Sequence, residues 1–194
     1  MNKSRLEAFS DGVIAIIITI MVLELKVPHG TSLDALRPLV PVFLSYVLSF
    51  VYVGIYWSNH HHLLHTASRV TGAMLWANLH FMFWLSLFPW ATAWMGENEF
   101  ATVPSAVYGV VLLMAALAWT LLQAQIIRAQ GSDSLLKKAL GSDLKGRLSP
   151  LMYLGGIAGS FVGPGLALAF YVGVALVWLV PDKRIERALN SERG

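Results

Sequence analysis

The carboxylate of Asp11 stands where a long apolar segment begins, in the stretch FSDGVIAIIITIMVLEL over residues 9–25. Between Gly12 and Glu24 the only polar side chain is the hydroxyl of Thr19. An ionisable group at the edge of a membrane-spanning helix marks a functional site by default and needs a partner. Arg5 and the Trp57 to His61 stretch are the candidate partners, and a simple interfacial cap is the alternative.

Four histidines follow one another closely in NHHHLLH, residues 59–65. His61 and His65 have the i,i+4 spacing that suits a transition metal. The stretch contains no cysteine and no carboxylate, so we expect no metal site here. These imidazoles are expected to form hydrogen bonds at the membrane interface, with His60 or His61 joining Asp11. Because imidazole titrates near neutral pH, they are also candidates for pH sensitivity.

The composition places these residues in a membrane protein. Of the 194 residues, 56% are hydrophobic and only 13% are charged, against about 25% charged residues in a soluble domain. The mean hydropathy is +0.62. The basic residues are scattered over short loops, so the net charge of +3 reflects membrane topology rather than a nucleic-acid partner. We expect an all-α, polytopic membrane protein.

Membrane spans follow from the apolar runs, since a helix needs about 20 apolar residues to cross a bilayer. A Gly163–Gly165 break divides the last long run, because Gly-Pro-Gly interrupts helices. We predict one domain, residues 1–194, with six spans near residues 8–26, 38–60, 70–95, 101–127, 149–162 and 165–181. The longest loop is interpreted as a plain solvated connector, and a short interfacial helix, capped by Ser132 or Asp133 and ending near Gly141, is the alternative.

The positive charges then predict the orientation. Six spans place both termini on one side, together with twelve of the fourteen Lys and Arg residues. Lys26 and Arg37 are the two on the other side. Because cytoplasmic loops carry the excess of basic residues, both termini are expected in the cytoplasm, with the chain in the cell inner or plasma membrane.

A resemblance emerges from the first two spans. RLEAFSDGVIAI, from Arg5 to Ile16, resembles the R-x-x-x-F-S-D signature that opens the first helix of the transmembrane-protein-175 family. WSNHH, from Trp57 to His61, is similar to the end of that family's second helix. The family comprises potassium channels, so the resemblance implies a homotetramer in membrane lipid, with a central pore lined by the first helix. It implies passage of potassium and other monovalent cations, without a cofactor.

The resemblance also implies roles for single residues. It assigns Ile16 to the narrowest point, with Ile20 and Leu23 continuing the pore lining and Thr19 contributing to ion preference. Hydrophobic rings gate channels by dewetting, and mobile hydroxyls imply only a modest preference for potassium over sodium. A helical wheel turns Asp11 about 140° away from Ile16. We therefore expect a structural polar network outside the ion path, made of Arg5, Phe9, Ser10, Asp11, Trp57, His60 and His61.

Other interpretations remain open at this stage. Without the resemblance, a lone threonine in a span usually bonds its own i−4 carbonyl, and an aliphatic stripe usually packs. A proton-coupled carrier that uses Asp11 and the histidines is the main alternative, and a scaffold without transport is another. Constellations typical of enzymes, such as Ser–His–carboxylate or H-E-x-x-H, are missing from the sequence, so we do not expect an enzyme.

Overall fold

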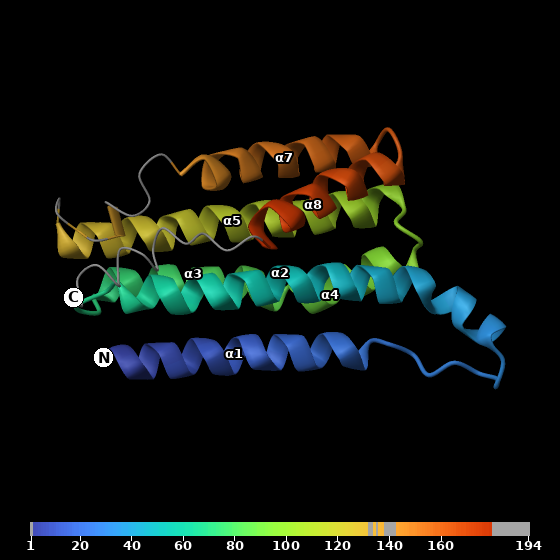
Figure 1. Cartoon of the computed structure of the whole chain (residues 1–194), viewed down its shortest axis with the longest axis horizontal. Helices are drawn as coiled ribbons and strands as arrows, with labels where there is room; N and C mark the ends of the chain where they lie inside the picture. Colours follow the sequence, from blue (N-terminus) through green and yellow to red (C-terminus); the bar gives the residue numbers. More distant parts are fainter. Residues whose placement is uncertain (1, 132–133, 135, 138–142, 180–194) are drawn as a thin grey trace.

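Long apolar helices, laid side by side and alternating in direction, make up the chain (Figure 1). The computed structural model describes residues 2–131, 134, 136–137 and 143–179. Its elements are α1 (Lys3–Leu23), the 3-10 helix η1 (Leu33–Leu39), α2 (Val40–His65), α3 (Gly72–Ser86), α4 (Phe88–Glu97), α5 (Thr102–Gln130), α7 (Leu144–Ser160) and α8 (Pro164–Leu179). The expected all-α class is confirmed.

By length and composition, three helical stretches of the described residues could cross a membrane: α1, the continuous η1–α2 stretch and α5. The shorter helix α8 is also apolar. The count of six spans therefore stays a prediction. The ends of the alternative interfacial helix, and residues 180–181 of the last span, lie outside the described residues.

The span predicted as one helix over residues 70–95 is interrupted at Leu87, where α3 ends and α4 begins. Pro89 explains the break. A proline has no N–H to donate and its ring clashes with the carbonyl four residues earlier, and it occupies the first turn of α4, where it is tolerated. The two short helices continue in the same direction (Figure 1), so together they replace the single predicted span.

Helix α1 begins earlier than the predicted span. Asn2 caps it, with a side chain that accepts a hydrogen bond from the backbone N–H of Ser4. The helix therefore includes the mostly polar stretch Lys3–Glu7 and ends at Leu23, three residues before the predicted limit. Hydropathy marks the part of a helix that crosses the membrane, whereas caps set where the helix itself starts.

The core gathers around α5, which packs against α3, α4, α7 and α8. Large buried side chains fill it, among them Tyr52, Tyr108, Tyr153 and Tyr171. Tyr171 lies directly against Gly109 of α5 and Gly156 of α7, where an added Cβ would overlap its ring. The glycines of the GGIAGS stretch therefore permit the close helix contact expected for small residues in a membrane.

Helix α1 lies along the edge of the bundle and packs against α2, α3 and α4 (Figure 1). Its buried face consists of Leu6, Ser10, Ile14, Ile17 and Met21. At one end of the bundle, the Lys3 ammonium donates to the carbonyl of His65, 3.0 Å away. At the other end, Lys26 forms an ion pair with Glu97. Contacts at both ends thus hold α1 to the rest of the chain.

Candidate functional site

The face of α1 opposite to the core is exposed and mostly apolar. Ile16 is 59% exposed and Leu23 is 76% exposed, and Ile20 lies beside them at 42%. Gly12 and Thr19 belong to the same exposed face. The four residues that the sequence predicted to line a pore, Ile16, Thr19, Ile20 and Leu23, therefore lie together on the side of α1 that no other helix of the described chain covers.

The hydroxyl of Thr19 donates to the carbonyl of Ala15 at 2.8 Å. This is the local bond expected for a threonine in an apolar helix. Since the hydroxyl proton points back along the helix, the oxygen is left as an acceptor on the exposed face. An oxygen with free lone pairs is the chemistry needed to replace water around a cation. The backbone bond and a role toward an ion are therefore compatible.

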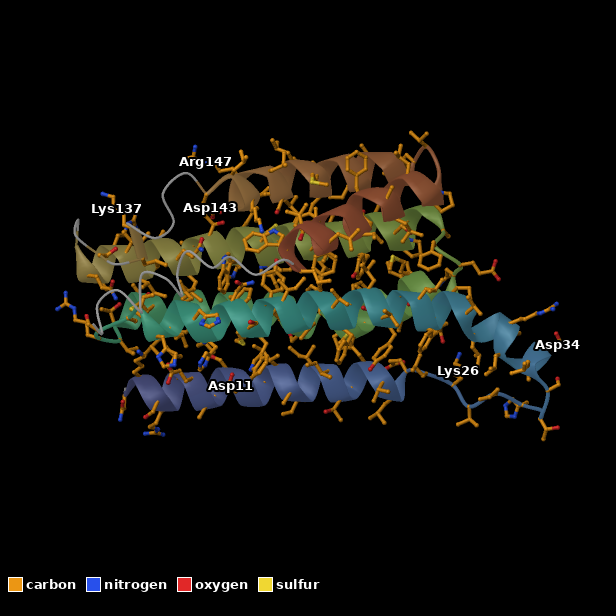
Figure 2. The ribbon with its side chains drawn as sticks, in the orientation of Figure 1. Asp11, Lys26, Asp34, Lys137, Asp143 and Arg147 are labelled. Atoms are coloured by element: carbon orange, nitrogen blue, oxygen red, sulfur yellow. The ribbon has the colours of Figure 1, made fainter. Side chains whose placement is uncertain are left out.

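Asp11 lies at the edge of α1 that faces α2 (Figure 2). Trp57 Nε1 donates to its Oδ1 at 3.1 Å, so the structure brings together two residues of the predicted polar network. Arg5 does not join them: within the described residues, Arg5 and Asp11 form no ion pair. Six positions on a helix separate two side chains by about 120°, which turns Arg5 toward the exposed face of α1 instead.

A second set of polar side chains is fully buried between α1, α2 and α3. Ser10 Oγ donates to the carbonyl of Leu6 at 2.9 Å and accepts from Asn78 Nδ2 at 2.9 Å. Asn78 Oδ1 lies 2.8 Å from His60 Nε2. His60 is thus connected to α1 through Asn78 and Ser10, whereas the sequence suggested a connection to Asp11.

Asn78 is the residue that the sequence prediction left out of this network. From the sequence, Asn78 is expected either to neighbour His80 or to form a hydrogen bond between helices, and the structure has the second. His80 is exposed and has its ring edge-on to Trp84 at 6.3 Å. A buried amide in an apolar helix needs a partner on another helix. An asparagine in this apolar stretch therefore indicates a contact between helices. Its partner could not be read from sequence, because the contact joins α3 to α1.

Phe9 and Arg5 mark the other flank of α1. Phe9 is 46% exposed. Together with Leu75 and Leu79 of α3, these residues line a shallow groove of about 320 Å³. Neither Phe9 nor Arg5 contacts Asp11 through a hydrogen bond within the described chain. The predicted network therefore divides on α1, with Asp11 at the edge of the exposed face toward α2 and Arg5 and Phe9 at its edge toward α3.

The remaining histidines of the cluster lie at the end of α2. The rings of His61 and His65 are 4.5 Å apart, and those of His61 and His62 are 5.6 Å apart. Among the described residues, no three His, Cys, Asp or Glu side chains are grouped to hold a metal ion. These three imidazoles thus contact one another at the end of α2.

Lys26 follows α1 in the loop that leads to η1 (Figure 2). Its ammonium donates to Glu97 Oε1 at 2.5 Å. This hydrogen bond, together with the negative charge of Glu97, raises the pKa of Lys26 above its ordinary value. The ammonium therefore keeps its charge at physiological pH, and the contact ties the loop after α1 to the end of α4.

Known proteins match this chain in sequence. The profile of the family described as endosomal/lysosomal potassium channel TMEM175 matches residues 5–89. A potassium channel of Chryseobacterium sp. (strain P1-3) is 58% identical over 191 residues, which cover 98% of this chain and 100% of that protein. The chain belongs to the TMEM175 family. It is accordingly a membrane protein, and the suspected relationship is confirmed.

Structural and animal relatives of the TMEM175 family extend the comparison. The crystal structure titled as a lysosomal potassium-selective channel TMEM175 homolog from Chamaesiphon minutus superposes with a TM-score of 0.80. It is 28% identical and covers 93% of this chain and 97% of its own. The human endosomal/lysosomal proton channel TMEM175 is 38% identical over 86 residues, 38% of this chain and 17% of that protein. The matched proteins are named as channels, in agreement with the expectation that the chain is not an enzyme.

The residues matched by the TMEM175 profile run from the first turn of α1 to the start of α4. They include the exposed face of α1, the Asp11–Trp57 contact and the chain from Ser10 through Asn78 to His60. The matched residues therefore include the contacts of Ser10 and Asp11 that join α1 to α2 and α3.

Proposed function

We propose that four copies of this chain assemble into a potassium-permeable channel whose central pore is lined by α1. One observation carries the proposal: α1 buries one face in its own subunit and leaves an apolar face with a single hydroxyl uncovered. In a ring of four subunits, that face would surround the axis. The relatives named as potassium channels, of which the first covers nearly the whole chain, support the same function.

The residues of the exposed face would have different roles in the pore. Four Ile16 side chains would form the narrowest ring, with Ile20 and Leu23 extending the constriction toward the far end. Such a ring excludes water when it narrows and so gates by dewetting. Four Thr19 oxygens would partly replace the hydration shell of an ion. Hydroxyls are mobile, so we propose only a modest preference for potassium over sodium.

The polar network lies at two edges of α1, and this arrangement is compatible with a ring of subunits. A ring repeats one heterologous contact, so the α2 side of one α1 faces the α3 side of the next. Asp11 and Trp57 lie on the first flank, and Phe9 and Arg5 lie on or toward the second. We therefore propose that Arg5 pairs with the Asp11 carboxylate of a neighbouring subunit. Both termini are proposed to lie in the cytoplasm, with the chain in the cell inner or plasma membrane.

The function is tested with the purified full-length protein in liposomes. A potassium channel passes potassium passively, and the flux follows an imposed voltage without any second ion. A carrier would require a proton gradient, detected with a pH-sensitive dye inside the same liposomes, and a scaffold would pass nothing. Imaging of the solubilised particle completes the test: α1 helices away from the symmetry axis would overturn the proposed pore.

A further inference from the structure

Two carbonyl groups at the end of α2 accept hydrogen bonds from two other helices. The last carbonyls of a helix have no partner within it, and α2 ends at His65. The carbonyl of His65 accepts from the ammonium of Lys3 on α1 at 3.0 Å. The carbonyl of Thr66 accepts from Nε2 of Gln130 on α5. Since α2 and α3 lie between α1 and α5 (Figure 1), two consecutive residues at the end of α2 connect helices on either side of it.

The contact with α5 runs in both directions. Arg69, in the segment after α2, donates from Nε and Nη2 to the carbonyl of Ala129 at 3.1 and 3.0 Å. Ala129 lies in the last turn of α5, where a positive charge also interacts favourably with the helix dipole. A guanidinium presents its N–H groups in a fixed fork, so two of them on one carbonyl hold the segment firmly against α5. We call the six residues that make these contacts the end clamp: Lys3, His65, Thr66, Arg69, Ala129 and Gln130.

The segment that joins the two halves of the end clamp is packed into the protein. Thr66 and Ala67 are only 8% and 4% exposed. The hydroxyl of Thr66 donates to the carbonyl of Leu63 at 2.7 Å, which fixes the turn to the last turn of α2. A displacement of α5 at Arg69 would therefore be passed on to the carbonyl that holds Lys3.

Lys3 lies on the side of α1 that faces the core. At about 100° per residue, it shares the face of the buried residues Ser10 and Ile14, and it points about 140° away from Ile16. Helix α1 continues without a break from Lys3 to Leu23, and Ile16 lies about 20 Å along it from Lys3. The hydrogen bond of Lys3 therefore constrains the rotation of α1, and this rotation determines which residues its exposed face presents.

We propose that the end clamp sets the rotation of α1, and that Arg69 and Gln130 are thereby positioning residues for the pore. The effect on ion flow rests on the proposed function, in which the exposed face of α1 lines the pore. Loss of the Arg69 contact releases the end of α5, then the turn at Thr66, and then the first turn of α1. The other explanation is local: each donor would only cap the helix end that it touches, and α1 would not respond to a change at Arg69.

Hydrogen exchange of the full-length protein in detergent, measured by mass spectrometry, separates the two explanations without any assumption about ion flow. Exchange reports local opening of a helix. Arg69→Met should speed exchange several-fold at the end of α5 and also in residues 7–14 of α1, and Gln130→Leu should act in the same direction. Lys3→Met should speed exchange in residues 7–14, whereas Lys3→Arg, which keeps a donor, should leave it slow. The Lys3→Met/Arg69→Met double variant should exchange there no faster than the faster single variant, as expected for one network.

Arg128→Met is the matched control, because Arg128 is exposed and lies in the same turn of α5 but is not part of the end clamp. It should leave exchange in α1 unchanged. If Arg69→Met does not fold, Arg69→Lys takes its place, since lysine keeps the charge and loses the fork, and it should speed exchange in the same two regions. Faster exchange limited to α5, or additive effects of Lys3→Met and Arg69→Met on α1, would overturn the proposal.

Potassium flux in liposomes tests the consequence for the pore. Lys3→Met and Arg69→Met should each change the flux several-fold and leave the preference for potassium over sodium unaltered, and Lys3→Arg should restore the flux of the unaltered protein. Unchanged flux in a variant whose α1 exchanges faster would overturn the role of the clamp in the pore. Liposomes in which even the unaltered protein passes no potassium would contradict the channel, and the exchange measurements would still decide whether the clamp holds α1.

Discussion

Ile14 and Ile16 are two positions apart on α1 and lie on different sides of it: Ile14 is 1% exposed, and Ile16 is 59% exposed. Ile14 therefore packs in the core, whereas Ile16 is the residue proposed to line the pore. We expect Ile16→Asn to raise the basal potassium flux several-fold, because an amide wets the ring that the isoleucine keeps dry. Flux from liposomes that hold equal amounts of folded protein measures the effect.

Ile14→Asn is the control for that substitution. It buries the same amide against α2, α3 and α4, where it lacks a partner, and should cost about 1–3 kcal/mol of stability without raising the flux. Equal flux from the Ile16→Asn variant and the unaltered protein would exclude Ile16 from the narrowest point of the pore.

Thr19→Ala removes the one hydroxyl on the exposed face of α1 and adds no bulk. We expect the variant to conduct, with the preference for potassium over sodium reduced. Thr120 offers a matched control on α5, since it is also exposed and also donates to its own i−4 carbonyl, that of Ala116, at 3.0 Å. Reversal potentials under potassium and sodium gradients should shift for Thr19→Ala and stay unchanged for Thr120→Ala. A shift of equal size in both variants would assign Thr19 to helix packing.

Asn78→Ala should destabilise the chain by about 1–3 kcal/mol, because it leaves the buried Ser10 hydroxyl and the His60 imidazole without their shared partner. Asn59→Ala should have little effect, since that amide donates to the carbonyl of Ile55 in its own helix. Thermal unfolding in detergent compares the two variants. Similar losses from both would show that the hydrogen bonds of Asn78 do not specifically stabilise the position of α1.

The difference between Asp11 and Asn78 shows how far the sequence can predict such a site. Asp11 and Trp57 belong to two short motifs, so their contact could be anticipated from a family resemblance. Asn78 stands alone in an apolar helix, and its partners come from α1 and α2. A contact between helices depends on their rotation and depth, which one sequence does not contain. The same limit explains why His60 was expected to contact Asp11 rather than Asn78.

Structural features that depend on hydropathy were predicted well. The helix ends and breaks that depend on single residues were predicted less well. Apolar runs predicted helices that include α1, α2 and α5, because burial in lipid requires long apolar segments. The break at Leu87 was missed because Leu87 and Pro89 lie inside an uninterrupted apolar run, and hydropathy treats the proline as an ordinary member of it. The start of α1 was placed too late for a related reason, since Asn2 caps a polar first turn.

The predicted orientation calls for a direct measurement. The excess of basic residues on one side favours cytoplasmic N- and C-termini, and the chain contains no cysteine of its own. Single cysteines introduced at positions 2 and 193 should both resist an impermeant thiol reagent in intact cells and react after the cells are opened. A cysteine introduced at position 29, in the loop after α1, should react in intact cells. Labelling of position 2 or 193 from outside would contradict the six-span topology.

Asp11 and Arg5 give the last prediction, which concerns the assembled particle. Asp11→Asn keeps the shape of the side chain and removes the charge, and Arg5→Ala removes the proposed partner on the next subunit. Each change should weaken the tetramer and alter the open probability more than the ion preference. A buried or poorly hydrated charge left unpaired is costly, so the double variant should lose less than the sum of the two single losses.

Trp57→Phe separates the contact within one subunit from the contact between subunits. It removes the N–H that reaches Asp11, so its effect on subunit stability should also be non-additive with Asp11→Asn. Arg5→Ala, in contrast, should couple to Asp11→Asn in the dissociation of the tetramer measured by native gel or mass photometry. Additive losses for Arg5→Ala and Asp11→Asn would mean that the two residues act separately. A change limited to ion selectivity would instead place Asp11 in the ion path.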